Sequence, residues 1–259
     1  MINLIVLGAK GRMGSTIINL VKNDKEINLV GAVEKKELID ELKDLDCKVS
    51  SDLEEVAKEF KNNAVLVDFT YPDVTMKASE ICEKYGIKEV IGTTGLSADQ
   101  LEVLQKRANK ISIFWAPNMS IGINVLLKLL PELLNLLGDE YDVEISEIHH
   151  KHKKDAPSGT AIKLAQTLAA SRGWKEDSIR YCREGFIGER PKKEIGVQAL
   201  RGGDVVGEHT VYFFGPGERI DVTHRAYSRE TFAKGAIRAC KWIVNQPPGK
   251  IYTMADLLS

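Results

Sequence analysis

Residues 2–14 read Ile2-Asn3-Leu4-Ile5-Val6-Leu7-Gly8-Ala9-Lys10-Gly11-Arg12-Met13-Gly14. The first six are strand-forming residues, and a helix pattern over residues 13–22 follows the glycines directly. Gly11 would let the backbone approach a pyrophosphate, Gly14 would let helix and strand pack closely, and the helix start would supply free amides. The stretch therefore predicts the first strand, turn and helix of a dinucleotide-binding domain, although Ala9 replaces the usual first glycine and Gly8 lies one place earlier.

A glycine pattern alone is also typical of an ordinary tight turn, so a second feature is needed. Glu34 lies twenty residues after Gly14, at the end of the second predicted strand, where an acidic residue binds the adenosine ribose hydroxyls. Lys35 and Lys36 follow it, and a cation there would neutralise the 2′-phosphate of NADP. The sequence therefore permits NADH, NADPH or both, and a solvated charged turn is the alternative interpretation of the lysines.

The first half of the chain alternates short strands with helices, as in a parallel sheet covered on both faces. The predicted strands are 2–7, 29–33, 65–69, 89–92 and 111–115, and the predicted helices are 13–22, 52–59, 74–85 and 98–108. Asp68-Phe69-Thr70 and Gly92-Thr93-Thr94-Gly95 end two strands, where open α/β sheets bind ligands, so we expect both near the cofactor. A plain β-to-α turn is the alternative for the second.

From Val143 the pattern changes to longer strands with glycine-rich turns, at 144–149, 196–200, 208–214 and 219–224. A last helix over residues 231–244 has apolar residues at helical spacing and is expected to pack back on the first domain. We therefore expect an α/β chain with a Rossmann-type parallel-sheet domain (1–118 and 230–259). A smaller α+β domain with a mixed or antiparallel sheet (119–229) would serve substrate binding and oligomerisation.

Composition excludes several classes of protein. The 36 Lys and Arg against 37 Asp and Glu give a net charge of -1, which supplies no field to hold nucleic acid or an anionic membrane. The longest apolar stretch, 125–137, is too short and too interrupted to span a bilayer, and we expect it to form an amphipathic core helix. The first residues show no signal-peptide pattern, so we expect a cytoplasmic protein. The four cysteines lie far apart without a C-x-x-C pair, which argues against a metal site or a disulfide framework.

The densest chemical signal is in residues 147–161, EIHHKHKKDAPSGTA. Ser158 is a good N-cap for a helix over 159–170, so Gly159 and Thr160 would present backbone amides beside a basic loop that suits a carboxylate. Imidazole and ammonium groups there could bind anions and donate a proton to a developing carbanion or enamine, as a reductase requires. The alternatives are a solvated basic loop and a metal site, which lacks a suitably spaced Cys or second carboxylate.

The sequence closely resembles the dihydrodipicolinate reductase family, also called 4-hydroxy-tetrahydrodipicolinate reductases, over nearly the whole chain. The resemblance rests on Gly8 to Gly14, Asp68-Phe69-Thr70, Gly92 to Gly95, Ala116-Pro117-Asn118-Met119 and above all residues 147–160. It implies NADH- or NADPH-dependent reduction of a cyclic imine with two carboxylates, giving tetrahydrodipicolinate for diaminopimelate and lysine biosynthesis. It also implies a homotetramer assembled through the substrate-domain sheets.

The resemblance assigns roles to individual residues. His149 and Lys153 align with the proton-donor candidates, and His150, Gly159 and Thr160 with the contacts to the substrate carboxylates. The implied cofactor contacts are Gly8, Ala9, Lys10, Gly11, Arg12, Met13, Glu34, Lys35, Gly92, Thr93, Thr94, Ala116, Pro117, Asn118 and Met119. Because NADP-preferring relatives commonly have Arg after the acidic residue, Lys35 leaves the cofactor preference open.

Several points stay open at the level of sequence. If residues 149–153 are extended, His149 and Lys153 share a face, and our hypothesis is that Lys153 transfers the proton while His149 assists. Arg229 could reach the site or be a hinge or surface residue. The rival functions are another two-domain oxidoreductase, such as an amino-acid dehydrogenase, and a nucleotide-sensing protein without turnover.

Overall fold

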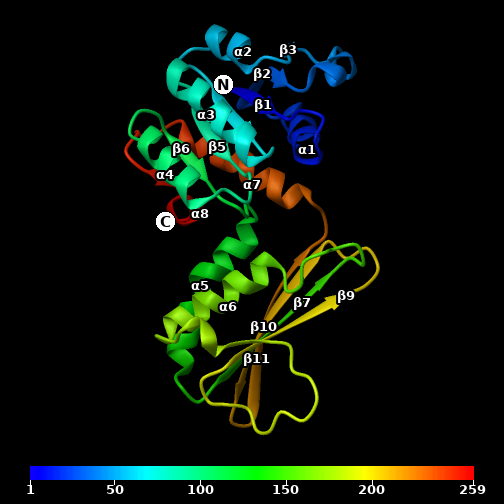
Figure 1. Ribbon diagram of the computed structural model, residues 1–259, viewed down its shortest axis with the longest axis vertical. Coiled ribbons are helices and arrows are strands. Elements are labelled where there is room, and N and C mark those ends of the chain that lie inside the picture. Colours follow the sequence, from blue (N-terminus) through cyan, green and yellow to red (C-terminus); the bar gives the residue numbers. More distant parts are fainter. The chain divides into compact units, whose positions relative to one another are not determined.

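The computed structural model describes residues 1–259, which form two compact units (Figure 1). The first comprises Met1–Ile121 and Glu230–Ser259, and the second comprises Gly122–Arg229. The second unit is thus an insertion in the sequence of the first.

The first unit contains a seven-stranded parallel sheet in the order β12-β6-β5-β4-β1-β2-β3. The strands are β1 (Ile2–Leu7), β2 (Ile27–Val33), β3 (Lys48–Ser50), β4 (Val65–Asp68), β5 (Lys88–Ile91), β6 (Ile113–Trp115) and β12 (Ile251–Tyr252). The helices are α1 (Arg12–Val21), α2 (Leu53–Glu59), α3 (Pro72–Tyr85), α4 (Ala98–Arg107), α7 (Glu230–Ile243) and α8 (Met254–Leu257), with a 3-10 helix, η1 (Lys36–Leu42). The order of β1 to β6 is that of a dinucleotide-binding sheet, so the expected Rossmann-type fold is confirmed.

Successive residues of β1 enter two different cores, because side chains alternate between the faces of a strand. Leu4 and Val6 pack in a core that includes residues of α1, α7 and α8. Ile5 and Leu7 pack in a second core, on the other face, with residues of α2, α3 and α4. The last long helix therefore returns to the first unit, as the sequence predicts.

The C-terminal segment is anchored to this sheet by polar contacts as well. The Lys88 ammonium on β5 donates hydrogen bonds to the carbonyl oxygens of Val244 (2.9 Å) and Gln246 (3.0 Å), just beyond α7. Farther along, Ile251 of β12 pairs with Ile113 of β6. Residues 230–259 thus complete a domain that residues 1–121 begin.

The second unit has a five-stranded mixed sheet in the order β11-β10-β7-β9-β8. Its strands are β7 (Asp142–His149), β8 (Ile179–Tyr181), β9 (Ile195–Arg201), β10 (Gly207–Gly215) and β11 (Glu218–Ala226). β7 runs parallel to β9 and antiparallel to β10. Helices α5 (Ile121–Leu137) and α6 (Gly159–Ser171) pack on one face of the sheet, and a short 3-10 helix, η2 (Glu176–Ser178), precedes β8. The expected mixed sheet is confirmed.

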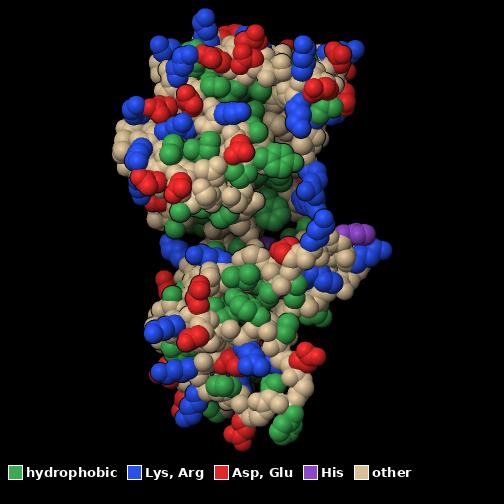
Figure 2. All heavy atoms as spheres, in the orientation of Figure 1, with side chains coloured by type: hydrophobic (Ala, Val, Ile, Leu, Met, Phe, Trp, Pro, Cys, Tyr) green, Lys and Arg blue, Asp and Glu red, His purple; other side chains and the backbone are tan.

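The surface bears out the charge balance of the sequence. On the face drawn in Figure 2, Lys and Arg side chains are interspersed with Asp and Glu over both units. None of the helices combines the length and the apolar character that a membrane crossing needs.

Candidate active site

The glycine turn after β1 is shaped by contacts that leave no room for side chains. Gly8 has a φ of +74°, and its carbonyl oxygen accepts a hydrogen bond from the Gly11 amide at 2.9 Å. A Cβ built on Gly14 would lie 2.1 Å from the Gly8 carbonyl oxygen. No side chain caps the start of α1 at Gly11, so the first helix amides point out of a narrow backbone turn. This geometry fits a pyrophosphate, as the sequence predicts.

Glu34, directly after β2, is bonded to this turn. Its two carboxylate oxygens accept hydrogen bonds from the backbone amides of Lys10 and Lys35, each at 2.8 Å. Each oxygen retains a further lone pair, so the carboxylate could still accept from a ribose hydroxyl. Lys35 and Lys36 are exposed, whereas the Lys10 ammonium pairs with Glu41 at 2.7 Å. The residues present therefore fit a dinucleotide.

A buried carboxylate orders the loops that follow β4 and β5. Asp68 accepts hydrogen bonds from the Thr70 hydroxyl (2.6 Å) and the Thr75 hydroxyl (2.5 Å), and the latter lies 2.8 Å from the Thr93 hydroxyl. Burial raises the pKa of Asp68, while the threonine hydrogen bonds act in the opposite direction. Gly92 packs so closely on Phe69 that a Cβ would lie 2.1 Å from the ring. The two loops are therefore held as one rigid surface.

The remaining predicted cofactor residues follow β6. The Ala116 amide donates to the Ile91 carbonyl oxygen at 3.1 Å, and Ala116 and Met119 are buried, while Pro117 is exposed. The Asn118 side chain accepts from the Ser120 amide at 2.9 Å. Because β1, β2, β4, β5 and β6 are parallel, the predicted cofactor residues, including exposed Thr94, all follow strand ends at one edge of the sheet.

In the second unit, three neighbouring strands change from apolar to polar at the same end. On β7 the row that faces the helices runs Val143, Ile145, Glu147, His149, all of them buried. β9 pairs Arg201 with His149, and β10 pairs His209 with Glu147. The strand alternation that builds the core therefore also aligns a carboxylate, two imidazoles and a guanidinium at its edge.

Glu147 is the centre of this cluster and has no exposed surface. The Arg201 guanidinium donates two hydrogen bonds to it, at 2.7 and 2.8 Å, and the Ser158 amide donates a third at 2.9 Å. His149 Nδ1 lies 2.6 Å from its Oε2. Burial raises the pKa of Glu147, but the hydrogen bonds from Arg201, His149 and Ser158 outweigh it, so that its pKa lies below the ordinary value.

The two imidazoles of the cluster lie edge to face, with ring centroids 5.2 Å apart. Burial lowers the pKa of His149, and the Lys153 and Arg201 charges add to this, whereas Glu147 raises it. Burial and the neighbouring His149 lower the pKa of His209 to about 3. His209 is therefore neutral, and its Nε2 lies 2.9 Å from the hydroxyl of Ser158. The same hydroxyl accepts a hydrogen bond from the Ala161 amide, because Ser158 is the N-cap of α6.

The loop after β7 corrects one expectation. Residues 149–153 are not extended, because β7 ends at His149 and the Lys153 amide closes a turn onto the His150 carbonyl oxygen at 3.1 Å. The Lys153 ammonium binds both carboxylate oxygens of Asp155 at 2.8 Å. The charge of Lys153 still contributes to lowering the pKa of His149. The expectation that His149 and Lys153 share one face of an extended segment was therefore wrong, although both residues belong to one cluster.

The predicted carboxylate contacts lie at the start of α6. Gly159 is its first residue, is exposed, and has no atom within 4 Å of a Cβ position; half-buried Thr160 follows it. His150 is half-buried, while Arg229 is exposed. Sequence reasoning missed Arg201 and His209 as members of this cluster. Side chains alternate between the two faces of β9 and β10, but only the strand register shows that Arg201 and His209 lie on the face of Glu147 and His149.

A nucleotide-type sheet edge in one unit and an imidazole, guanidinium and ammonium cluster in the other define the class of two-domain, nucleotide-dependent oxidoreductases. Residues 2–119 match the family described as dihydrodipicolinate reductase, N-terminus, and residues 122–258 match its C-terminus. The chain therefore belongs to the dihydrodipicolinate reductase family, and the resemblance stated from the sequence is confirmed.

Individual relatives cover the whole chain. The 4-hydroxy-tetrahydrodipicolinate reductase of Oleidesulfovibrio alaskensis is 53% identical over 258 residues, covering 99% of each chain. That of Nitratidesulfovibrio vulgaris is 52% identical over 257 residues, again covering 99% of each. A solved dipicolinate-bound dihydrodipicolinate reductase from Paenisporosarcina sp. TG-14 superposes with a TM-score of 0.79 at 26% identity, covering 98% of this chain and 97% of the other.

Proposed function

We propose that the protein catalyses the NADH- or NADPH-dependent reduction of 4-hydroxy-tetrahydrodipicolinate to tetrahydrodipicolinate in diaminopimelate and lysine biosynthesis. The observation that carries the proposal is the match to both halves of the family together with full-length relatives of that name. The run of lysines and histidines in the loop before α6 supports it, because an otherwise neutral protein needs a local site for a doubly anionic substrate.

The first unit would hold the cofactor, which supplies the hydride when bound. The turn Gly8 to Met13 and the start of α1 would bind the pyrophosphate, and Glu34 the adenosine ribose. Lys35 is exposed beside Glu34 and would meet a 2′-phosphate if NADPH binds. The Asp68 network would hold Gly92, Thr93 and Thr94 against the nicotinamide end, with residues 116–119 beside them.

The second unit would bind the substrate and supply the proton. The start of α6, at Gly159 and Thr160, and His150 would bind its carboxylates. Lys153 would transfer the proton, and His149 would orient or assist. Because Asp155 binds the Lys153 ammonium, the substrate would have to displace this exposed carboxylate before the lysine could act. This unit would also form the homotetramer through its sheet, and the enzyme would work in the cytoplasm.

The test is oxidation of NADH and of NADPH with substrate generated fresh from pyruvate and aspartate semialdehyde by a coupling synthase. Rapid turnover would support the reaction, and the two rates would give the cofactor preference. Binding of either cofactor without turnover would overturn the substrate assignment and favour another imino or keto acid.

The proton-transfer roles need separate variants. We expect Lys153→Met to lower kcat about 100-fold or more, within the range of general acid catalysis. His149→Gln should lower it less. The exposed neighbours provide matched controls, since Lys154→Met and His152→Gln remove the same groups from the same loop. If Lys153→Met stays within a few-fold of the wild type while His149→Gln collapses, the roles are reversed.

A further inference from the structure

The cluster on β7, β9 and β10 contains two groups without an assigned role in the proposed reaction, Glu147 and Arg201. Both oxygens of Glu147 accept from Arg201, and only Oε2 also contacts His149. Arg201 continues to the loop, donating to the Asp155 carbonyl oxygen at 2.6 Å. The Gly202 amide donates to the His149 carbonyl oxygen at 3.0 Å. One guanidinium thus connects the strand with the histidine and the loop with the lysine.

The orientation of His149 follows from these contacts. An ionised carboxylate only accepts hydrogen bonds, so Nδ1 carries the proton that lies between it and Glu147. Nε2 makes no hydrogen bond within the protein and is therefore the nitrogen left for a ligand. The ring lies against Gly207, where a Cβ would come within 3.0 Å of Nε2. A side chain at position 207 would therefore crowd this nitrogen.

We propose that Glu147 and Arg201 form a positioning pair, which fixes His149 with Nδ1 protonated and presents Nε2 to the substrate. The inference rests on the proposed function, because it assigns the pair to the same site. Glu147 orients the ring, while Arg201 keeps Glu147 ionised without a buried unpaired charge.

The charges around His149 predict opposite effects for the two partners. The groups that face it are Glu147 on its own strand, Arg201 on β9, neutral His209 on β10 and Lys153 on the following loop. Without the Glu147 charge, the remaining neighbours are two cations and the neutral His209. None of these stabilises a protonated His149, so the pKa of His149 should fall. Without Arg201, Glu147 still has the hydrogen bonds from the Ser158 amide and His149 Nδ1 to hold its charge, and His149 becomes the main partner of that charge, so the pKa of His149 should rise.

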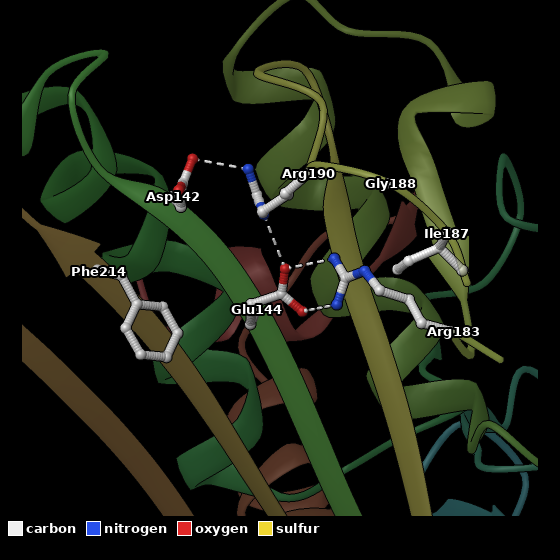
Figure 3. A pocket seen from close by; sticks show the side chains of 7 residues that line it. All are labelled: Asp142, Glu144, Arg183, Ile187, Gly188, Arg190 and Phe214. Atoms are coloured by element: carbon white, nitrogen blue, oxygen red, sulfur yellow. Dashed lines mark hydrogen bonds and ion pairs between the residues drawn. The ribbon is translucent and has the colours of Figure 1, made fainter. Parts of the chain in front are cut away.

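The same strand offers a matched control pair. Glu144, three residues before Glu147, also binds an arginine through both oxygens, with Arg183 at 2.6 and 2.7 Å (Figure 3). This pair lines a pocket with Asp142 and Arg190, where acidic groups balance the arginines. It shares the ion-pair chemistry of Glu147 and Arg201 but contacts no histidine. Glu144→Gln and Arg183→Met therefore report the general cost of breaking such a pair.

The experiment is NMR titration of the His149 ring, assigned with His149→Gln, in the wild type and in Glu147→Gln, Arg201→Met and the two controls. We expect the pKa of His149 to fall by about one unit in Glu147→Gln, to rise in Arg201→Met, and to stay within about 0.3 units in the controls. The ring nitrogen shifts should show the proton on Nδ1 in the neutral wild-type form. For Glu147→Gln, kcat should fall about 10- to 100-fold with little change in KM.

Shifts of the same sign in both variants, or none, would overturn the proposal. If Glu147→Gln does not fold, Arg201→Met and the milder Arg201→Lys decide the sign, with Arg201→Lys expected to restore most of the wild-type titration. The titration needs no turnover. Opposite shifts in a protein without reductase activity would refute the proposed function alone, whereas activity without the shifts would refute the positioning pair alone.

Discussion

Glu89 on β5 is a buried acid outside the candidate site, and its titration should make stability fall as pH rises. Its side chain is 1% exposed and accepts a hydrogen bond from the Ser79 hydroxyl at 2.8 Å. Burial, with a contribution from the charge of Asp68, raises the pKa of Glu89 to about 8 from an ordinary 4.5. The folded protein therefore keeps a proton that the unfolded chain releases, and stability falls as pH rises from about 4.5 to 8.

The perturbation is Glu89→Gln, which keeps the size and the acceptor for Ser79 but removes the titration. At about 1.4 kcal/mol per pKa unit, the variant should gain about 3 kcal/mol over the wild type between pH 5 and pH 8. Urea unfolding at four pH values across this range measures the difference. Glu80→Gln, on the exposed side of α3, is the control and should run parallel to the wild type. A Glu89→Gln curve parallel to the wild type would refute the reasoning, because Glu89 would then be ionised in the folded state.

Three other substitutions test the site. Gly14→Ala should destabilise the protein by about 3 kcal/mol and weaken NADH binding at least about tenfold, because its methyl would overlap the Gly8 carbonyl oxygen. Calorimetry measures both the stability and the NADH affinity, and an unchanged melting temperature would contradict the turn geometry. Gly207→Ala should lower kcat about tenfold by displacing His149, with little loss of stability, so steady-state rates equal to wild type would show that the ring is free to move. Lys35→Ala should raise the KM for NADPH more than that for NADH, and equal increases would exclude its contact with a 2′-phosphate.

Most of the first unit could be predicted from the sequence, because its signals are local. Residues 2–14 carry the strand, the turn and the helix within one stretch, and the alternation that follows fixes a parallel sheet. The elements that escaped prediction are short. The three-residue strands Lys48–Ser50 and Ile179–Tyr181 and the two-residue strand Ile251–Tyr252 contain too few residues to show a period.

The candidate site also contains residues with a local sequence signal and residues that depend on strand pairing. Residues 147–161 could be found because their chemistry is concentrated in one segment. Arg201 is 54 residues from Glu147 and joins it only because β9 pairs with β7 in one register. A shift of one residue would turn its side chain to the other face, and nothing local in the sequence sets that register.

The insertion of the second unit imposes an order on biosynthesis. Residues 1–121 leave the ribosome before the inserted unit. Helix α7, strand β12 and the carbonyl groups that accept hydrogen bonds from Lys88 emerge only after the whole inserted unit. The strands of the second unit are contiguous in the chain, so this unit can fold while the nascent first unit still lacks one edge strand and a helix of its core. The part of the protein that is translated first is therefore the part that is finished last.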